Sequence, residues 1–520
     1  MEDKGLGKVL FVFILGIAAF YMVDINPGVA YIMAGAAFFI LFFFKSREAI
    51  IAYAIYFSFE EVIMFHVPES FVLLLRYLGD VMILAFFFAV FAKMALRHYR
   101  LEFFRENKLH FFVLLFLVSS IISAVLNTIP VDIAFVSIRQ LLRYIVVFYS
   151  IVMTSQEEWT QTDLKNLVKI VIVLIFLQAG LGYLQMVLGP GSALTRFLSV
   201  GQVTEFGAVG IGGSVAEENR GRLLGTLVNP NTFGLFLTGG FCFVLGLYLC
   251  TRGEKRNMTL LFLLMFLLFP LLQSFSRQSI YATLLGSAVI GLLKKELKIL
   301  FLTVLIVGCF GLYFYQAKEA ALEQGPSISL GQRIISPFQA QYHKRFLHSD
   351  RLFALNSFAP DFLKTRYAYF GVGPGGVGSP YGLYRNYFEG YKKLGIPTAL
   401  IGTVHIGVSD VGFLAIVGQY GVVGFILFYF MFLNLFVYIQ RKVLPYLEDS
   451  FCQGITLGFS GYIVALLASN IGYANFTVRQ LSFYFWLLAA VICSFKRTPE
   501  ALVLDKEAPS MLPSRSGGVT

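Results

Sequence analysis

The chain of 520 residues is 57% hydrophobic and 16% aromatic, carries only 14% charged residues, and has a mean hydropathy of +0.74. Soluble globular proteins average about 45–50% apolar and about 25% charged residues, so the composition excludes an ordinary soluble domain and indicates an integral membrane protein. The formal net charge of +11 does not indicate a nucleic-acid partner, because the basic residues cluster in short connections between apolar runs. That distribution is the positive-inside pattern that orients membrane proteins.

Apolar runs of about 17–25 residues, the length that crosses a bilayer as a helix, recur along the whole chain. We predict an all-α, polytopic membrane domain over residues 1–497 with about fourteen transmembrane helices. The predicted spans lie near 9–23, 28–44, 49–65, 71–91, 109–126, 133–153, 166–188, 231–250, 258–274, 279–293, 299–315, 411–438, 451–469 and 480–495. The first run lacks a small-residue cleavage site, so we expect it to be retained as a span.

The order of the predicted spans gives an expected sidedness. With the amino terminus in the cytoplasm, the basic clusters fall on the cytoplasmic side and both termini are cytoplasmic. Residues 498–520 are rich in Pro, Ser and Gly and are expected to form a disordered cytoplasmic tail. Two larger loops, about 189–230 and about 316–408, then face the opposite, outer side.

The outer loop at 316–408 is the one long water-compatible insert in the sequence. It carries Arg333, Arg351 and Arg366 and a glycine-rich turn at 371–376, and it ends with His405 shortly before the apolar run at 411–438. The glycine-rich turn lacks the Lys-Ser/Thr pair of a P-loop and does not open a dinucleotide-binding unit. We therefore expect it to be a tight turn.

Arginines within or beside the spans are candidate functional residues, because ionisable groups are costly in a membrane. Six lie on the predicted outer side: Arg139, Arg143, Arg222, Arg277, Arg351 and Arg479. Planar guanidinium groups hydrogen-bond phosphate oxygens in pairs, so several together can hold a pyrophosphate and stabilise the charge that develops as it leaves. For each arginine the alternative is snorkelling to the interface or pairing with an acidic residue.

Acidic residues near the spans have a simpler interpretation. Asp80 with Arg76, and Glu60 and Glu61 opposite them across a short loop, are expected to form structural ion pairs near the interface. His405 is the only histidine at the outer start of a predicted span. An imidazole can accept a proton near neutral pH, and the alternative for His405 is a capping or packing role.

The cysteines give no sign of a metal or redox site. All five lie in or beside apolar runs, and neither they nor the histidines show the spacing of zinc ligands. We expect no metal and no cofactor.

Several short motifs follow one another in a recognisable order. They are Arg222, then Asn229-Pro230-Asn231, then Phe275-Ser276-Arg277, then Arg351 leading to the glycine-rich turn, then His405 and Gly421-Val422-Val423-Gly424. This succession covers about residues 200–430 and resembles the O-antigen ligase and Wzy-type O-antigen polymerase superfamily of bacterial membrane proteins.

The resemblance implies a metal-independent, inverting glycosyltransferase whose donor is an undecaprenyl-pyrophosphate-linked glycan at the periplasmic face of the inner membrane. Transferred to this chain, the family roles have Arg222 and Arg351 engage the donor pyrophosphate, with Arg277 supporting them and His405 activating or orienting the acceptor hydroxyl. Arg139, Arg143 and Arg479 are secondary candidates.

The leading interpretation is a polysaccharide polymerase, because about fourteen spans are more typical of the polymerase branch than of the ligase branch. A ligase that transfers glycan to lipid A-core is the alternative within the family. A transporter or flippase for an anionic lipid-linked substrate is a third, disfavoured because the polar candidates gather at one face and the two halves of the chain differ. The expected partners are the lipid bilayer, the lipid-linked glycan, and, for a polymerase, a chain-length regulator and a flippase.

Overall fold

The computed structural model describes most of the chain, and the structural statements below concern these residues. They are 15–16, 18–19, 22, 25–67, 69–97, 106–189, 192–198, 203–204, 207–208, 222–227, 229–251, 254–296, 298, 301, 304–305, 359–396, 408–409 and 411–495. Within these ranges the chain is helical almost throughout, and the two-residue strands β1 (Val203–Thr204) and β2 (Gly207–Ala208) form one antiparallel pair.

Long helices occupy the positions of the predicted spans. They are α2 (Pro27–Phe44), α3 (Ser46–His66), α4 (Glu69–Arg97), α6 (Leu109–Leu126), α7 (Val131–Glu158), α8 (Gln161–Leu188), α11 (Pro230–Cys250), α12 (Glu254–Gln273), α13 (Arg277–Lys294), α22 (Gly412–Tyr438), α23 (Ser450–Ser469) and α24 (Arg479–Cys493). The short helices are α9 (Ala193–Leu198), α18 (Ala359–Leu363), α19 (Pro380–Tyr384), α20 (Glu389–Lys393), η5 (Ile439–Val443), η6 (Leu444–Tyr446) and η7 (Asn475–Thr477).

Eight of the described helices are long and apolar enough to cross a membrane, which makes the chain a multi-pass helical membrane protein. The helix α7 is not among them, and it carries Asp132, Arg139 and Arg143. Most of the predicted spans 9–23 and 299–315 lies outside the described residues. The total of about fourteen spans therefore stays a prediction.

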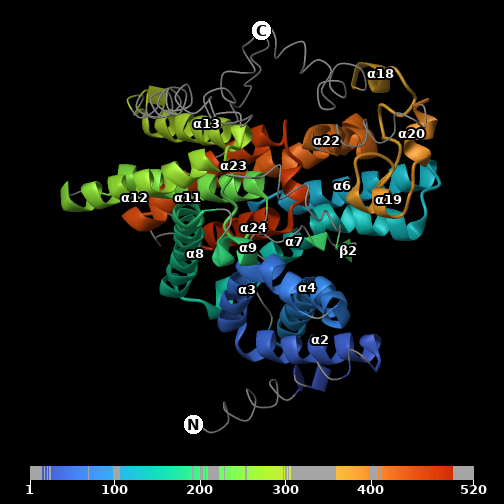
Figure 1. Cartoon of the computed structure of the whole chain (residues 1–520), viewed down its shortest axis with the longest axis horizontal. Coiled ribbons are helices and arrows are strands. Elements are labelled where there is room, and N and C mark those ends of the chain that lie inside the picture. Colours follow the sequence, from blue (N-terminus) through green and yellow to red (C-terminus); the bar gives the residue numbers. More distant parts are fainter. Residues whose placement is uncertain are drawn as a thin grey trace, which may run out of the picture.

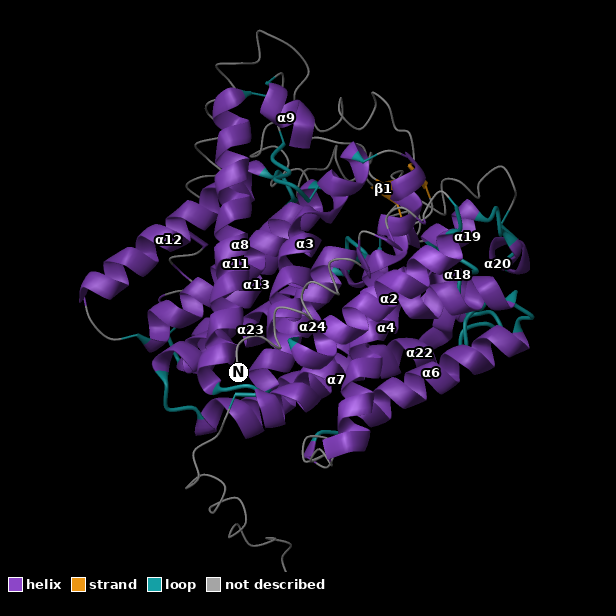
Figure 2. Ribbon diagram, turned by 90° about the horizontal axis from the view of Figure 1, so that it is seen from below, coloured by secondary structure: helices purple, strands orange, loops and turns teal. Residues whose placement is uncertain are grey.

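The centre of the molecule is formed by α11, α23 and α24 (Figures 1 and 2), whose residues are buried along most of their length. Glycines allow α11 and α23 to pack backbone to backbone: a Cβ on Gly246 would lie 2.1 Å from the carbonyl oxygen of Gly454. Small residues at such contacts are typical of helix pairs in membranes. By contrast, only 22% of α2 is buried, so its apolar surface is available to lipid.

The helix α22 is broken at Gly421, where φ is 70° and ψ is −175°. A Cβ at this position would lie 2.2 Å from the carbonyl oxygen of Tyr369, and a positive φ favours glycine. Beyond the break, Val422 N donates to the carbonyl of Ala368 over 2.8 Å and Val423 N to that of Tyr369 over 3.1 Å. Backbone groups that the break releases from the helix are thus paired with the long insert.

The glycine segment, which we define as residues 371–379, packs into this break. Val372 N donates to the carbonyl of Gly418 over 2.9 Å, and Gly373 N donates to that of Gln419 over 3.1 Å. Irregular backbone at membrane depth is tolerated where protein buries it, and this segment is buried throughout. The turn predicted at 371–376 therefore fills an interruption in a membrane-spanning helix.

Candidate functional site

The first candidate site forms where segment 222–227 runs past the turn between α12 and α13. Leu223 N donates to the carbonyl of Gln273 over 3.3 Å. The Nε of Arg222 donates to the carbonyl of Ser274 over 3.0 Å, and a terminal nitrogen of Arg222 lies 3.5 Å from Oδ1 of Asn231. Arg277 begins α13 three residues after Ser274. Three motifs that are separate in the sequence therefore meet in space, and we call this the Arg222–Arg277 cluster.

Two helices begin in this cluster, and each has a side-chain cap. Oδ1 of Asn229 accepts from Asn231 N over 2.8 Å at the start of α11, and Oγ of Ser276 accepts from Ser279 N over 3.4 Å at the start of α13. Asparagine and serine are favoured at this position because their side chains satisfy amides of the first turn. Helix starts carry a partial positive charge, so the cluster combines two of them with two arginines. This arrangement suits an anion.

The loop at 470–478 contacts this cluster at two places. Gln278 donates through Nε2 to the carbonyl of Gly472, and the hydroxyls of Tyr473 and Thr232 lie 2.9 Å apart. The loop then leads through η7 to Arg479, the first residue of α24. It thereby ties the starts of α11, α13 and α24 to one another.

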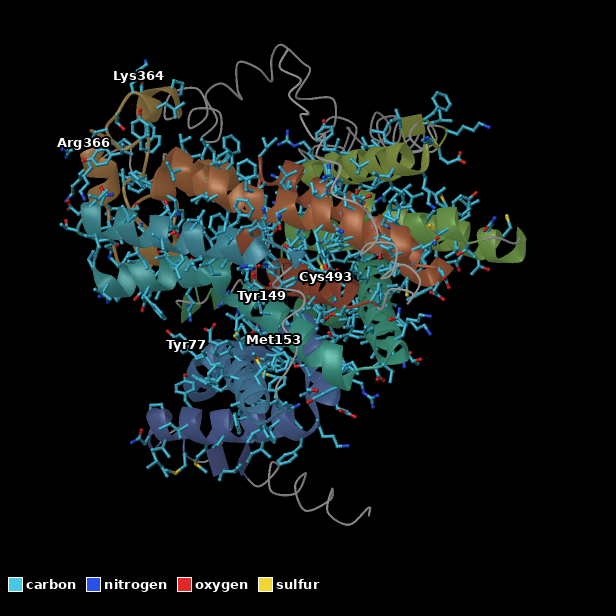
Figure 3. All side chains as sticks on the ribbon, turned by 180° about the vertical axis from the view of Figure 1, so that it is seen from behind. Tyr77, Tyr149, Met153, Lys364, Arg366 and Cys493 are labelled. Atoms are coloured by element: carbon cyan, nitrogen blue, oxygen red, sulfur yellow. The ribbon has the colours of Figure 1, made fainter. Side chains whose placement is uncertain are left out.

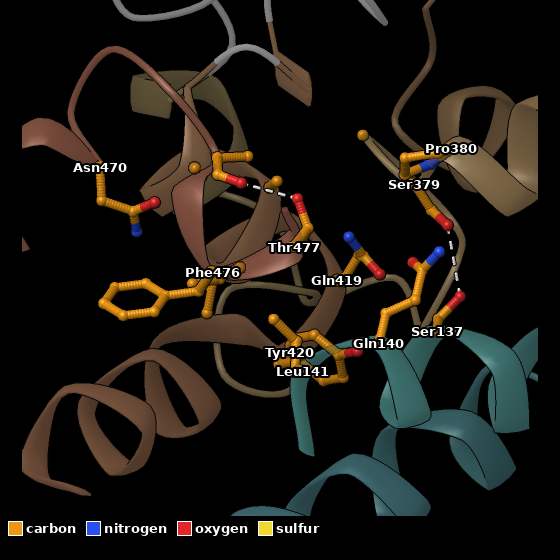
Figure 4. Close-up of a pocket in the computed structure, with 15 residues that line it drawn as sticks. Ser137, Gln140, Leu141, Ser379, Pro380, Gln419, Tyr420, Asn470, Phe476 and Thr477 are labelled. Atoms are coloured by element: carbon orange, nitrogen blue, oxygen red, sulfur yellow. Dashed lines mark hydrogen bonds between the residues drawn. The ribbon is translucent and has the colours of Figure 1, made fainter. Parts of the chain in front are cut away.

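The same loop forms one wall of a small pocket, whose cavity volume of about 20 Å³ has room for little more than a water molecule. The other walls are α7, the start of α22 and the end of the glycine segment (Figure 4). Its polar lining residues are Ser137, Gln140, Ser379, Gln419, Asn470 and Thr477. None of these residues is among the candidates that the sequence suggested, although a glutamine within an apolar run, such as Gln140 or Gln419, is a signal of a polar site between helices.

The secondary arginine candidates have acidic partners. Arg139 lies 2.5 Å and Arg143 lies 3.5 Å from carboxylate oxygens of Asp80, and Arg479 lies 2.7 Å from Oε1 of Glu60. We call these five residues the ion-pair cluster. The side chains of Arg143 and Glu60 are 4% and 0% exposed, so the pairs are buried between helices.

Asp80 was expected to pair with Arg76, whose side chain lies outside the described part of the chain. The pair with Arg76 therefore stays a prediction. The described partners of Asp80 come from α7, 59 residues or more along the sequence. Glu60 and Glu61 bind across to the start of α24, because Gln480 donates to Glu61 over 2.9 Å while Arg479 pairs with Glu60. The acidic residues of α3 and α4 thus fasten these helices to α24 and α7.

Of the other candidate residues in the long insert, the structure describes only Arg366. His405, Arg351 and Arg333 lie outside the described residues, as does most of the loop at 189–230. Arg366 is described and lies with Lys364 at one edge of the molecule, far from the central Cys493 (Figure 3). Its guanidinium lies 5.0 Å from the ring centre of Tyr367.

Comparison with protein-family models and with curated proteins found no match to this chain.

Proposed function

We propose that the chain is a polysaccharide polymerase that joins undecaprenyl-pyrophosphate-linked oligosaccharide repeat units at the periplasmic face of the bacterial inner membrane. The product would be an O-antigen, capsule or exopolysaccharide. The observation that carries the proposal is the meeting of Arg222 and Asn231 with the turn that ends at Arg277. Two arginines beside two helix starts have the charge and the donors that a pyrophosphate needs.

The proposed reaction is an inverting glycosyl transfer. The acceptor hydroxyl oxygen attacks the anomeric carbon of the donor, and the bond from that carbon to the lipid pyrophosphate oxygen breaks with its electrons passing to the pyrophosphate. Arg222 and Arg351 hold the leaving pyrophosphate and Arg277 supports them, which stabilises the charge as it develops. His405 accepts the proton of the hydroxyl or orients that hydroxyl.

One feature of the fold favours a transporter as a second candidate. Broken helices such as α22 are common at the binding sites of secondary transporters, where the released backbone coordinates the substrate. In this chain, backbone groups at the break are paired with residues 368–373 of the insert. Because these backbone groups already have partners within the protein, the break is better explained as a packing contact with the insert than as an ion-binding site.

The proposal is tested by supplying purified protein with lipid-linked repeat units alone. A growing ladder of products is expected for a polymerase, whereas a ligase would give product only after a lipid A-core acceptor is added. Movement of the lipid-linked units across proteoliposomes without any new glycosidic bond would identify a transporter.

Two substitutions connect this activity to its residues. His405→Ala and Arg222→Ala should each abolish the ladder at normal protein levels. If both variants make polysaccharide of unchanged length, neither His405 nor Arg222 takes part in the reaction.

A further inference from the structure

We propose that two buried glutamines of α8, Gln185 and Gln178, position Arg222 by holding the backbone of the segment that follows it. This segment is residues 223–227, and the inference rests on the proposed function of the Arg222–Arg277 cluster. The glutamines are positioning residues, because they act on the chain that carries Arg222 and not on the substrate.

The segment at 223–227 belongs to no helix or strand, yet all of its residues are buried. Buried backbone groups are nearly always hydrogen-bonded, so its amides need partners from elsewhere in the fold. Leu223 N donates to the carbonyl of Gln273, in α12, over 3.3 Å. The next three amides are paired by side chains of α8.

Gln185 pairs with this segment much as a neighbouring strand would. Its Oε1 accepts from the backbone N of Leu224 over 3.2 Å and from that of Gly225 over 3.0 Å. Its Nε2 donates to the carbonyl of Gly225 over 3.1 Å. A side-chain amide offers both an acceptor and donors, so this one residue satisfies three backbone groups.

Gln178 lies seven residues earlier, on the same face of α8, and is 0% exposed. Its Oε1 accepts from Thr226 N over 2.9 Å, and its Nε2 donates to the hydroxyl of Thr226 over 2.6 Å. The same nitrogen donates to the carbonyl of Ser58 over 3.3 Å, and the hydroxyl of Thr226 donates there as well. The segment is therefore tied to α3 and to α8, which pack against each other (Figure 2).

Gly225 makes the close approach of the glutamines possible. Its φ is 57°, a conformation that favours glycine. A Cβ at this position would lie 2.5 Å from Oε1 of Gln178 and 2.9 Å from the ring of Phe233 in α11. The segment thus has a glycine at the residue where a side chain would displace its partners.

Arg222 directly precedes this paired stretch. Its Nε donates to the carbonyl of Ser274 over 3.0 Å, one residue beyond the carbonyl that accepts from Leu223 N. Because each amide from 223 to 226 has a partner, the backbone beside Arg222 has a fixed place relative to the start of α13. A displacement of about 1 Å in a group that positions substrate can lower a rate about a hundredfold. The two glutamines therefore affect the donor site as well as the fold.

A double-mutant cycle on the full chain in nanodiscs tests the proposal, with undecaprenyl pyrophosphate as the probe. Gln185→Met keeps the length of the side chain and removes its amide. It should weaken binding about fivefold, the value of about one hydrogen bond. In the Arg222→Ala background it should have no further effect, because the glutamine acts through that arginine. The same loss in both backgrounds would overturn the proposal.

The matched control is Asn127→Leu, which removes another buried amide. Nδ2 of Asn127 donates to the carbonyl of Ser123 over 2.8 Å and to that of Gly371 over 3.0 Å, so its partners lie in α6 and the glycine segment. It should lower the melting temperature as Gln185→Met does and leave binding per folded protein unchanged. Equal losses of binding in the two variants would show a general loosening of the fold and contradict a positioning role.

Hydrogen exchange keeps this proposal apart from that of the donor site, because it needs no ligand. Gln185→Met and Gln178→Met should each speed exchange at the amides of 224–226 while α13 stays protected. Unchanged exchange would overturn the positioning role even if Arg222→Ala loses binding. If Arg222→Ala binds like the wild type, the proposed donor site fails, and the exchange result alone decides whether the glutamines hold the segment. Gln178→Met replaces Gln185→Met in the cycle if the latter does not fold.

Discussion

The ion-pair cluster and the Arg222–Arg277 cluster both contain arginines, but the described contacts of those arginines differ. In the ion-pair cluster, Arg139 and Arg143 share the carboxylate of Asp80, and Arg479 meets Glu60. In the Arg222–Arg277 cluster, the Arg222 contacts described above go to a backbone carbonyl and an asparagine amide. The first group joins helices to one another, and the second lies where two helices begin.

The difference shows that an arginine in a membrane helix is not a ligand site by virtue of its charge alone. When a buried guanidinium lies beside a carboxylate, the two charges compensate each other and the ion pair links the helices that carry them. Burying either charge without the other would be costly. A guanidinium beside helix starts adds to a positive region. Substitutions in the two clusters should therefore affect different properties, activity in one and stability in the other.

The largest expected effect is on activity in the Arg222–Arg277 cluster. Arg222→Ala should lower the rate of polymer formation about a thousandfold, the upper range for removing one group that stabilises charge in a transition state. Arg222→Lys keeps the charge but loses the planar fork and should recover part of the rate. The measurement is ladder formation by purified protein, with the melting temperature as the check on folding.

The next effect is on stability in the ion-pair cluster. Asp80→Asn removes a carboxylate that the partly buried Arg139 and the buried Arg143 contact. It should destabilise the protein by about 3 kcal/mol, measured by thermal unfolding in detergent. The fraction that remains folded should keep its specific activity. Full stability together with lost activity would instead place Asp80 at the substrate.

A smaller loss of stability is expected at the break in α22. Gly421→Ala forces a side chain into a left-handed conformation and against the carbonyl of Tyr369, and should cost about 2 kcal/mol. Gly180→Ala in α8 is the matched control, because a Cβ there meets nothing within 4 Å and alanine favours a helix. Equal melting temperatures for the two variants would argue against the docked glycine segment.

The smallest effect is expected at the start of α23, away from both clusters. Oδ1 of Asp449 accepts from Cys452 N over 2.9 Å, and its other oxygen lies 3.0 Å from Nζ of Lys165. Asp449→Ala should cost about 1 kcal/mol, the usual value of a helix cap, with no change in activity. If Asp449→Ala lowers the stability more than Asp80→Asn does, the helix cap contributes more to stability than the buried ion pairs.

Much of the helical framework could be predicted from the sequence, because apolar runs of membrane-spanning length are a strong local signal. The start of α11 at Asn229-Pro230 and that of α13 at Ser276 also follow local rules. The sequence offered no such signal for the partners of Asp80, because those contacts depend on how α4 packs beside α7. The break at Gly421 was hidden within a continuously apolar stretch, and its partner lies some fifty residues earlier in the insert.

The pocket was harder to foresee for the same reason. Its polar residues come from four separate parts of the chain, and no single part has a recognisable motif. The order of Arg222, Asn229-Pro230-Asn231 and Arg277 was visible in the sequence, and the structure adds that these residues are neighbours.

The most direct test of the account is binding of undecaprenyl pyrophosphate to the full chain in nanodiscs. The wild type and Arg366→Ala, which removes an arginine from the edge of the molecule, should bind equally, and Asp80→Asn should bind normally once corrected for its folded fraction. Arg222→Ala should bind at least tenfold more weakly. Equal binding by Arg222→Ala and the wild type would contradict the assignment of the Arg222–Arg277 cluster to the donor pyrophosphate.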